Sequence, residues 1–354
     1  MPHADLLLLS TDLQRGGTPT VVRNLAVQLS RLGVNVEVAC LDGPGETGAE
    51  ITAAAVPVHT LNARSPRDIN AVWRLRELVR HRRYSRVFSL LLHANAAAAM
   101  VKGFVPPGTQ WFQSVQTTQP NPAWHWAVQR LIAPAAAGII VPSPSVAAAL
   151  AARCDLDPSA ITVIPNGVDF EALSGLPRTG GCVGFVGRLD PVKRIGDLIA
   201  AAPLLGGRPV RIWGDGPERG RLESLALAAR ARGSDVHLLG PIASPAEALP
   251  LCDVLVLPSL AEGFGLVLIE AMAAGVPVVA TRAPGIVDVV RHGENGLLFD
   301  VGDIAGLAAA VRRLSDDSVL RQTLTADARR EVRLAYDWAA IARRYIRALS
   351  LDRS

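Results

Sequence analysis

The sequence predicts an α/β protein with two doubly wound parallel sheets. Short continuous apolar runs alternate with segments of helical spacing, as expected for parallel strands that are buried on both faces. The alternation stops at a Gly- and Pro-rich stretch at residues 164–181 and then resumes. The length of 354 residues fits two domains of about 150 residues each.

In the first half, residues 6–9 form an apolar run, followed by a loop at 10–17 and a helical pattern at 20–31. Further strands are predicted at the positions 34–39, 89–92 and 138–141. This half is expected to be a domain of residues 1–165, followed by a linker at 166–181.

The second half repeats the alternation, and its domain is expected to span residues 182–335. The predicted strands are 182–186, 210–213, 236–239, 254–257 and 278–280. The predicted helices are 195–205, 221–230 and 266–273. From residue 303 onward the chain has a helical, Arg-rich pattern, and residues 336–354 are expected to form a helix that packs back on the first domain.

Composition excludes several classes of protein. Hydrophobic residues make up 49% of the chain and charged residues 19%, which is unlike a disordered protein. A formal net charge of +4 gives no reason to expect a nucleic-acid partner. Among the 36 basic residues only Lys102 and Lys193 are lysines, so arginine dominates.

Residues 131–152 carry no charge and are long enough to span a bilayer. Three prolines in this window favour a helix end, a strand at 138–141 and a new helix from residue 145 instead. The N-terminus lacks the pattern of a signal peptide, so a soluble, cytoplasmic protein is expected. The four cysteines have neither metal-binding nor redox spacing, and no metal or cofactor is expected.

Two glycine pairs follow predicted strands. Gly16-Gly17 precedes a helix, and Gly214-Asp215-Gly216 follows the strand at 210–213. Such loops let backbone N–H groups approach an anion at a helix N-terminus, although an isolated pair is more often a tight turn. Neither matches Gly-x-Gly-x-x-Gly, which disfavours a nicotinamide dehydrogenase.

The segment 258–277 carries the strongest chemical signal. Glu262 lies in the loop after a strand, and Glu270 lies about two turns into the following helix. Gly263 and Gly265 leave backbone N–H groups accessible at the positive end of that helix. A carboxylate such as that of Glu270, surrounded by apolar neighbours, suits the diol of a ribose or hexose.

These residues resemble the E-x7-E motif of the retaining glycosyltransferases of family 4, which have the GT-B architecture of two Rossmann-like domains facing a central cleft. Further matching stretches occur in the same order: Gly16-Gly17, Ile164–Asp169, Phe185–Lys193, Gly214–Pro217 and Gly293–Gly296. The resemblance covers nearly the whole chain and is stronger in the second half.

The resemblance implies roles for individual residues. Those implied to be catalytic are His93, Glu262, Arg188 and Lys193. Those implied to bind the donor are Gly16, Gly17, Arg188, Lys193, Gly214, Asp215, Gly216, Ile242, Glu262, Gly263, Phe264, Gly265, Leu266 and Glu270. Arg188 and Lys193 would hold the donor diphosphate, and fixed cations can stabilise the departing phosphate without a metal ion. Glu270 would bind the ribose, and Glu262 would face the transferred sugar.

The first domain departs from the family in one place. His93 resembles the family histidine at a strand end, although a lone histidine there is equally consistent with a core residue. Where the family often has a second histidine, this chain has Gln116, which cannot act as an acid or base. A front-side mechanism, in which the leaving phosphate accepts the acceptor's proton, does not need that histidine.

The resemblance therefore implies transfer of a hexose, with retention, from a nucleoside-diphosphate sugar to a glycan or lipid-linked acceptor. A nucleotide-sugar epimerase or phosphorylase of the same fold, or an inactive sugar-nucleotide-binding protein, is the alternative. Six arginines between Arg74 and Arg86 could place the protein on the inner face of an anionic membrane, or could be an ordinary exposed helix.

Overall fold

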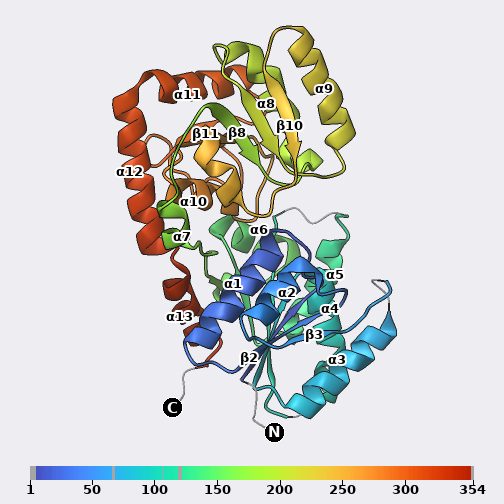
Figure 1. Ribbon diagram of the computed structural model, residues 1–354. Coiled ribbons are helices and arrows are strands. Elements are labelled where there is room, and N and C mark those ends of the chain that lie inside the picture. The colour runs from blue at the N-terminus through green and yellow to red at the C-terminus, as the bar shows by residue number, and fades with distance from the viewer. Residues whose placement is uncertain (1–4, 66–67, 106, 119–121, 352–354) are drawn as a thin grey trace. The chain divides into compact units, whose positions relative to one another are not determined.

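The computed structural model describes residues 5–65, 68–105, 107–118 and 122–351, which form two compact units (Figure 1). The first unit runs to Gly167 and takes the chain up again at Trp338, and the second unit comprises Val168–Asp337.

The first unit contains, within the described residues, a seven-stranded parallel sheet in the order β3-β2-β1-β4-β5-β6-β7. Its strands are β1 (Leu6–Ser10), β2 (Val36–Cys40), β3 (Val58–Thr60), β4 (Arg86–Leu90), β5 (Gln110–Ser114), β6 (Gly138–Val141) and β7 (Ile161–Val163). Its helices are α1 (Gly17–Arg31), α2 (Gly45–Ala53), α3 (Ile69–Arg82), α4 (Leu92–Val101), α5 (His125–Ile132), α6 (Pro144–Cys154) and α13 (Trp338–Ala348). Every residue of β1 is buried, because helices cover both faces of the sheet.

The uncharged window at residues 131–152 folds as the prolines indicate. It contains the end of α5, the strand β6 and the start of α6, where Ser143 accepts a hydrogen bond from the backbone N–H of Val146 as a helix cap. Within the part of the chain that the structure describes, no helix combines the length and apolarity needed to cross a bilayer.

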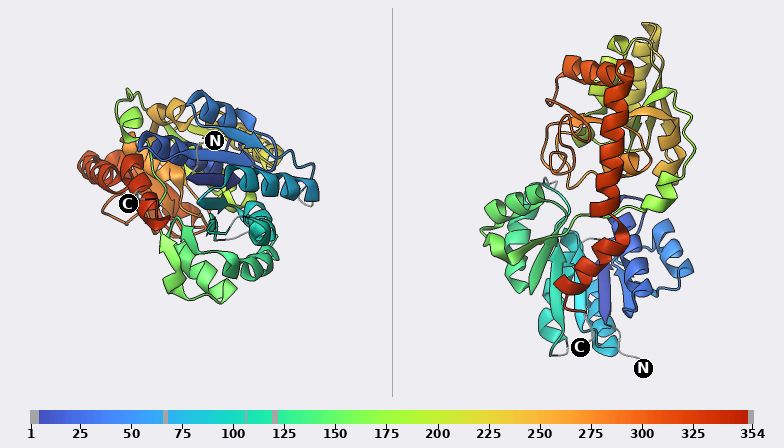
Figure 2. Two further views of the ribbon diagram at one scale, coloured as in Figure 1. Left: turned by 90° about the horizontal axis from the view of Figure 1, so that it is seen from below. Right: turned by 90° about the vertical axis from the view of Figure 1, so that its left-hand side faces the viewer.

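The C-terminal helix α13 packs on α1 in the first unit (Figure 2). The Tyr345 ring lies 5.6 Å from that of Phe88 on β4, and Arg86 Nε donates to the carbonyl of Leu349 at 2.8 Å. A fully buried tyrosine and an arginine that binds a carbonyl at the chain's end anchor this helix.

The second unit has, in its described residues, a six-stranded parallel sheet in the order β10-β9-β8-β11-β12-β13. The strands are β8 (Cys182–Val186), β9 (Val210–Trp213), β10 (Val236–Gly240), β11 (Cys252–Leu257), β12 (Val278–Thr281) and β13 (Leu297–Phe299). The helices are α7 (Phe170–Ser174), α8 (Ile195–Ala201), α9 (Arg219–Ala231), α10 (Leu266–Ala273), α11 (Ile304–Asp316) and α12 (Ser318–Ala335). The prediction of two doubly wound α/β domains is confirmed.

Both sheets reverse their strand order at one place, between β1 and β4 in the first unit and between β8 and β11 in the second. In open parallel sheets a ligand crevice forms beyond the carboxyl ends of the strands at such a switch point. The loops that follow these four strands are therefore the places where the fold itself favours a binding site.

Some local predictions differ from the structure. Instead of a bare linker at 166–181, the chain joins the second unit at Val168 and forms α7, capped by Asp169. The strand predicted at 89–92 is β4, which ends at Leu90 because α4 starts at Leu92. The cysteines at positions 182 and 252, for which the sequence predicts no pairing, lie opposite each other on β8 and β11.

Candidate functional site

Lys193 and Glu262 form an ion pair at the switch point of the second sheet. Lys193 ends the loop after β8, and its Nζ donates to both carboxylate oxygens of Glu262, at 2.6 and 2.8 Å. Glu262 lies in the loop after β11, and its side chain is only 10% exposed. Ser259 Oγ also donates to Glu262 at 2.6 Å, so the carboxylate is held by neighbours from both loops.

Backbone contacts fix the same two loops. Leu260 N–H donates to the carbonyl of Val192 at 2.8 Å, which ties the loop after β11 to the loop after β8. Glu262 N–H donates to Pro284, and a Cβ added to Gly285 would lie 2.1 Å from the carbonyl oxygen of Glu262. The position of the Glu262 carboxylate is therefore determined by its backbone as well as by its ion pair.

The loop after β9 lies directly against the loop after β8. Gly214 has φ +141°, and a Cβ there would lie 1.9 Å from the carbonyl oxygen of Gly187. A Cβ on Gly216 would lie 2.5 Å from the carbonyl oxygen of Leu189. These glycines are required by close approach of two backbones. Asp215 uses its side chain locally, because it accepts from the N–H of Gly216.

Arg188 is the most open of the predicted charged groups. Its side chain is 71% exposed, and its Nε lies 3.3 Å from a carboxylate oxygen of Asp190. It follows β8 by two residues, so it lies at the same sheet edge as Lys193. A long exposed guanidinium of this kind can turn toward a phosphate with little loss of existing contacts.

Helix α10 begins at the predicted position. Gly265 precedes it with φ +81°, and Phe264 is buried against Tyr336 with a ring-centroid distance of 5.6 Å. Phe264 therefore acts as a core residue that fixes the loop. Leu266, the first helical residue, and Glu270 are both partly buried. The sequence pattern alone predicted the start of this helix.

Ile242 lies two residues after β10, and it packs partly buried against the core of the second unit. Together with the residues above it belongs to the carboxyl edge of the sheet. The second unit thus contains every predicted donor residue except Gly16 and Gly17, which belong to the first unit.

Gly16 and Gly17 stand at the switch point of the first sheet. Gly17 is the first residue of α1, three residues earlier than the sequence pattern predicts, and no side chain caps this helix end. Pro19 occupies the first turn, where a missing N–H costs no helical hydrogen bond. Both glycines are exposed, which leaves this helix N-terminus open to an anion.

His93 lies at the same switch point but in the first turn of α4, which corrects its predicted place at the end of a strand. Leu91, just before the helix, has φ +74°, a region that costs a non-glycine residue free energy and is common at functional sites. Asn95 holds this helix start, since its side chain accepts from Ser89 and donates to the carbonyl of Ser114.

His125 is a neighbour of His93 that sequence reasoning missed. The two rings meet edge to face with centroids 5.8 Å apart, and the Trp124 ring lies 4.4 Å from that of His125. Burial lowers the pKa of His125, and the nearby charge of His93 lowers it further. Gln116 donates to the hydroxyl of Ser114 at 2.6 Å. Nothing in the spacing of residues 93 and 125 signals their contact.

Several of the six arginines in the basic segment are occupied. Helix α3 ends at Arg82, and Arg86 belongs to β4, so the segment is not one helix. Arg74 donates to the carbonyls of Leu61 and Asn62, while Arg82 pairs with buried Glu37. The exposed members are Arg74, Arg80 and Arg83.

Metal ligands do not gather in the second-unit site. In the described ranges no group of three or more His, Cys, Asp or Glu side chains is placed to hold a metal ion. The site offers one lysine, one exposed arginine, the carboxylates of Asp215, Glu262 and Glu270, and a helix N-terminus, which can bind an anion and hydroxyl groups together.

Comparisons with known proteins match both units. A family described as "Glycosyltransferase Family 4" matches residues 15–172, and one described as "Glycosyl transferases group 1" matches residues 180–317. A phosphatidyl-myo-inositol mannosyltransferase of Mycobacterium leprae is 38% identical over 198 residues, 52% of each chain. A D-inositol 3-phosphate glycosyltransferase of Nocardioides is 32% identical over 256 residues, 63% of this chain and 56% of that protein. The chain thus spans about half the length of the curated relatives it matches.

The fold is shared with solved structures. Anabaena Alr3699/HepE in complex with UDP-glucose has a TM-score of 0.88 at 20% identity, over 99% of this chain and 100% of that chain. Sucrose-phosphate synthase of Thermosynechococcus elongatus has a TM-score of 0.83 at 23% identity, over 98% of this chain and 100% of that chain. The GT-B fold is therefore confirmed. With a glycosyltransferase family match over each unit, the chain belongs to the glycosyltransferases of family 4.

Proposed function

We propose that the protein transfers a hexose from a nucleoside-diphosphate sugar to a glycan or lipid-linked acceptor, with retention of the anomeric configuration and without a metal ion. The observation that carries the proposal is the Lys193–Glu262 pair at the switch point of the second sheet. It places a cation and a carboxylate of the E-x7-E motif in one loop cluster.

In the proposed reaction, Lys193 and Arg188 bind the diphosphate and stabilise the negative charge that develops as the bond to the sugar breaks. The backbone N–H groups of Gly263 and Gly265 and the open end of α1 at Gly16 and Gly17 bind further oxygens. Glu270 accepts hydrogen bonds from the ribose, and Glu262 orients the hexose. These residues supply a fixed field of charges and donors, which removes the need for a metal.

The acceptor's proton passes to the leaving phosphate in this proposal, so no general base is required of the first unit. His93 contacts the hexose, and the ring of His125 packs edge to face against the ring of His93. Relatives named for inositol-containing acceptors support an acceptor rich in hydroxyl groups, and Anabaena HepE with UDP-glucose supports a UDP-sugar donor as the first to test.

Peripheral contact with the inner face of an anionic membrane is part of the proposal. Ile69 and Trp73 on α3 are 62% and 57% exposed, and Phe104 after α4 is 64% exposed. The same region of the first unit carries the exposed Arg80 and Arg83, and exposed apolar and basic side chains together are the combination that an interfacial surface uses. Arg76 stacks on both Trp73 and Phe104, which holds the two rings together.

The test is a transfer assay with a panel of nucleoside-diphosphate hexoses and a membrane-derived acceptor mixture, followed by NMR of the product's anomeric centre. Lys193→Ala and Glu262→Ala should each abolish transfer while circular dichroism shows an intact fold. Normal turnover in both variants would refute the assignment. Product formed without any acceptor would instead support the epimerase, and donor binding without turnover would support an inactive binding protein.

A further inference from the structure

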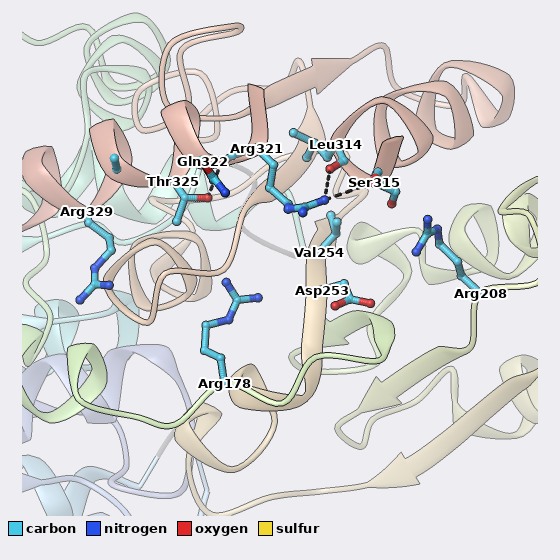
Figure 3. Close-up of a pocket in the computed structure, with 11 residues that line it drawn as sticks. Arg178, Arg208, Asp253, Val254, Leu314, Ser315, Arg321, Gln322, Thr325 and Arg329 are labelled. Atoms are coloured by element: carbon cyan, nitrogen blue, oxygen red, sulfur yellow. Dashed lines mark hydrogen bonds between the residues drawn. The ribbon is translucent and has the colours of Figure 1, made fainter. Parts of the chain in front are cut away.

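A pocket of about 620 Å³ lies at the amino edge of the second sheet (Figure 3). It opens between α12 and the first residues of β11, and its lining includes arginine, hydroxyl and amide side chains. The loop that carries Glu262 follows the other end of β11, after Leu257. At about 3.3 Å per residue, the length of this strand separates the two places by about 15 Å.

Four arginines from three parts of the second unit line this pocket, together with one carboxylate, that of Asp253. Arg178 precedes β8 and Arg208 precedes β9, while Arg321 and Arg329 lie two turns apart on α12. Figure 3 shows the guanidinium groups of Arg178 and Arg321 extending into the space between the helix and the strand from opposite sides.

Carbonyl groups hold three of these guanidinium groups in place. Arg178 donates through Nη1 to Gly275 and through Nη2 to Cys252, the latter at 2.8 Å. In hydrogen bonds with other described residues, Arg321 donates only through Nη1, to carbonyls in the last turn of α11. Arg329 likewise donates only through Nη2, to the carbonyl of Ser174. The remaining nitrogens of Arg321 and Arg329 are available to a ligand, in positions fixed beforehand.

The cluster is electrostatically unbalanced within the described residues. The ion pair of Arg208 with Asp316 is long, at 3.9 Å, and Asp316 is 76% exposed. Partial burial lowers the pKa of Arg178. The charges of Asp253 and Cys252 raise this pKa, and the charges of Arg321 and Arg329 lower it further. Like charges held close together raise the free energy of the empty pocket, and an anion bound among them would remove that cost.

We propose that this pocket binds a small phosphate ester, with the phosphate among the arginines and a hydroxyl-bearing body against Ser315, Gln322 and Thr325. Guanidinium groups match the paired oxygens of a phosphate, and several of them together favour a doubly charged group over a single carboxylate. The volume lies within the range of about 300–1,000 Å³ that small-molecule sites occupy. The site is separate from the donor site, so its ligand need not be a substrate.

The test is isothermal titration calorimetry of the full chain with glucose 6-phosphate, inorganic phosphate and glucose. Glucose 6-phosphate should bind at least tenfold more tightly than inorganic phosphate, and glucose should give no binding. Arg208→Gln combined with Arg321→Gln should weaken binding at least tenfold. Two exposed arginines of the same unit that do not line the pocket provide the matched control: Arg232→Gln with Arg312→Gln removes the same charge and should leave affinity within twofold.

A second variant guards against loss of folding in the first. Thr325→Glu places a carboxylate in the pocket on a helix that tolerates glutamate, and it should abolish binding. Lys193→Ala should leave binding unchanged, because the donor site is not involved. Equal weakening in the pocket and control variants, loss of binding in Lys193→Ala, equal affinity for inorganic phosphate, or no binding of the ester would each overturn the proposal.

Discussion

Lys193 Nζ lies within 2.8 Å of both carboxylate oxygens of Glu262, although the two residues are 69 positions apart in the chain. Their side chains are 21% and 10% exposed, so both charges are largely removed from water. A charge pair in such surroundings is costly to break by removing one partner. This relationship links the stability of the two loops to the donor binding proposed for them.

The pair should behave as one unit in a double-mutant cycle. Lys193→Met leaves the Glu262 carboxylate with an unmatched charge and should cost about 2 kcal/mol of unfolding free energy. Glu262→Gln should cost a similar amount, and the double variant should lose less than the sum. Urea unfolding of the four proteins measures this coupling. Strictly additive losses would mean that the two side chains do not stabilise each other.

Lys193→Arg should reduce kcat by about tenfold or more, equivalent to about 1.4 kcal/mol of transition-state stabilisation. A guanidinium is larger and planar, so it cannot keep the position of the ammonium between Glu262 and the donor diphosphate. Lys102→Arg is the matched control, because Lys102 is the chain's other lysine and lies exposed in the first unit, where it donates to the carbonyl of Ala135. Normal kinetics in Lys193→Arg would contradict the proposed role of the ammonium.

Gly214→Ala should destabilise the second unit by at least about 2 kcal/mol. Its new methyl group would lie against the carbonyl of Gly187, in a backbone conformation that alanine rarely adopts. Gly220→Ala, in the first turns of α9 and with open space around its Cβ, should be neutral or slightly stabilising. Thermal unfolding distinguishes the two, and equal melting temperatures would show that the two loops can separate without cost.

Stability should fall as the pH decreases from about 6.5, partly through His125. Its folded-state pKa is lowered below 6.5, so the unfolded chain takes up the proton first as the pH falls. His125→Asn should therefore lose less melting temperature between pH 7 and pH 5 than the unchanged protein. His81→Asn, at a histidine on the surface of α3 that is 75% exposed, is the control. If His125→Asn loses as much melting temperature over this pH range as the unchanged protein, the histidine pair is not the cause of the decline.

Cys40 should not react with a thiol reagent in the native protein at pH 8. Burial raises its pKa to about 11, and burial also raises the pKa of Cys154, so little thiolate is present at either position. All four cysteines are buried. Titration with a chromogenic disulfide should detect no rapid reaction until denaturant is added; a rapid native reaction would show that one thiol is open to solvent.

Much of this architecture could be predicted from local sequence. Strands such as β8, β9 and β6 occur at the predicted residues, because a continuous apolar run between turn residues has few other stable conformations in a globular protein. Strands β3, β5, β7 and β13 were missed. Strands β3, β7 and β13 have only three residues each, and β5 begins and ends in polar residues, so none of them gives a long apolar run. Pairing within the sheet, not local propensity, makes them strands.

The sequence by itself determined that this chain has two doubly wound α/β units, and it determined the loop chemistry of the segment from Pro258 to Gly265, because hydrophobic periodicity and a charged motif are local properties. The tertiary structure alone decided which charges meet. The contact of Lys193 with Glu262, the contact of His93 with His125 and the gathering of arginines beside α12 depend on how the strands and helices pack. Such contacts join residues far apart in the chain, so no spacing in the sequence encodes them.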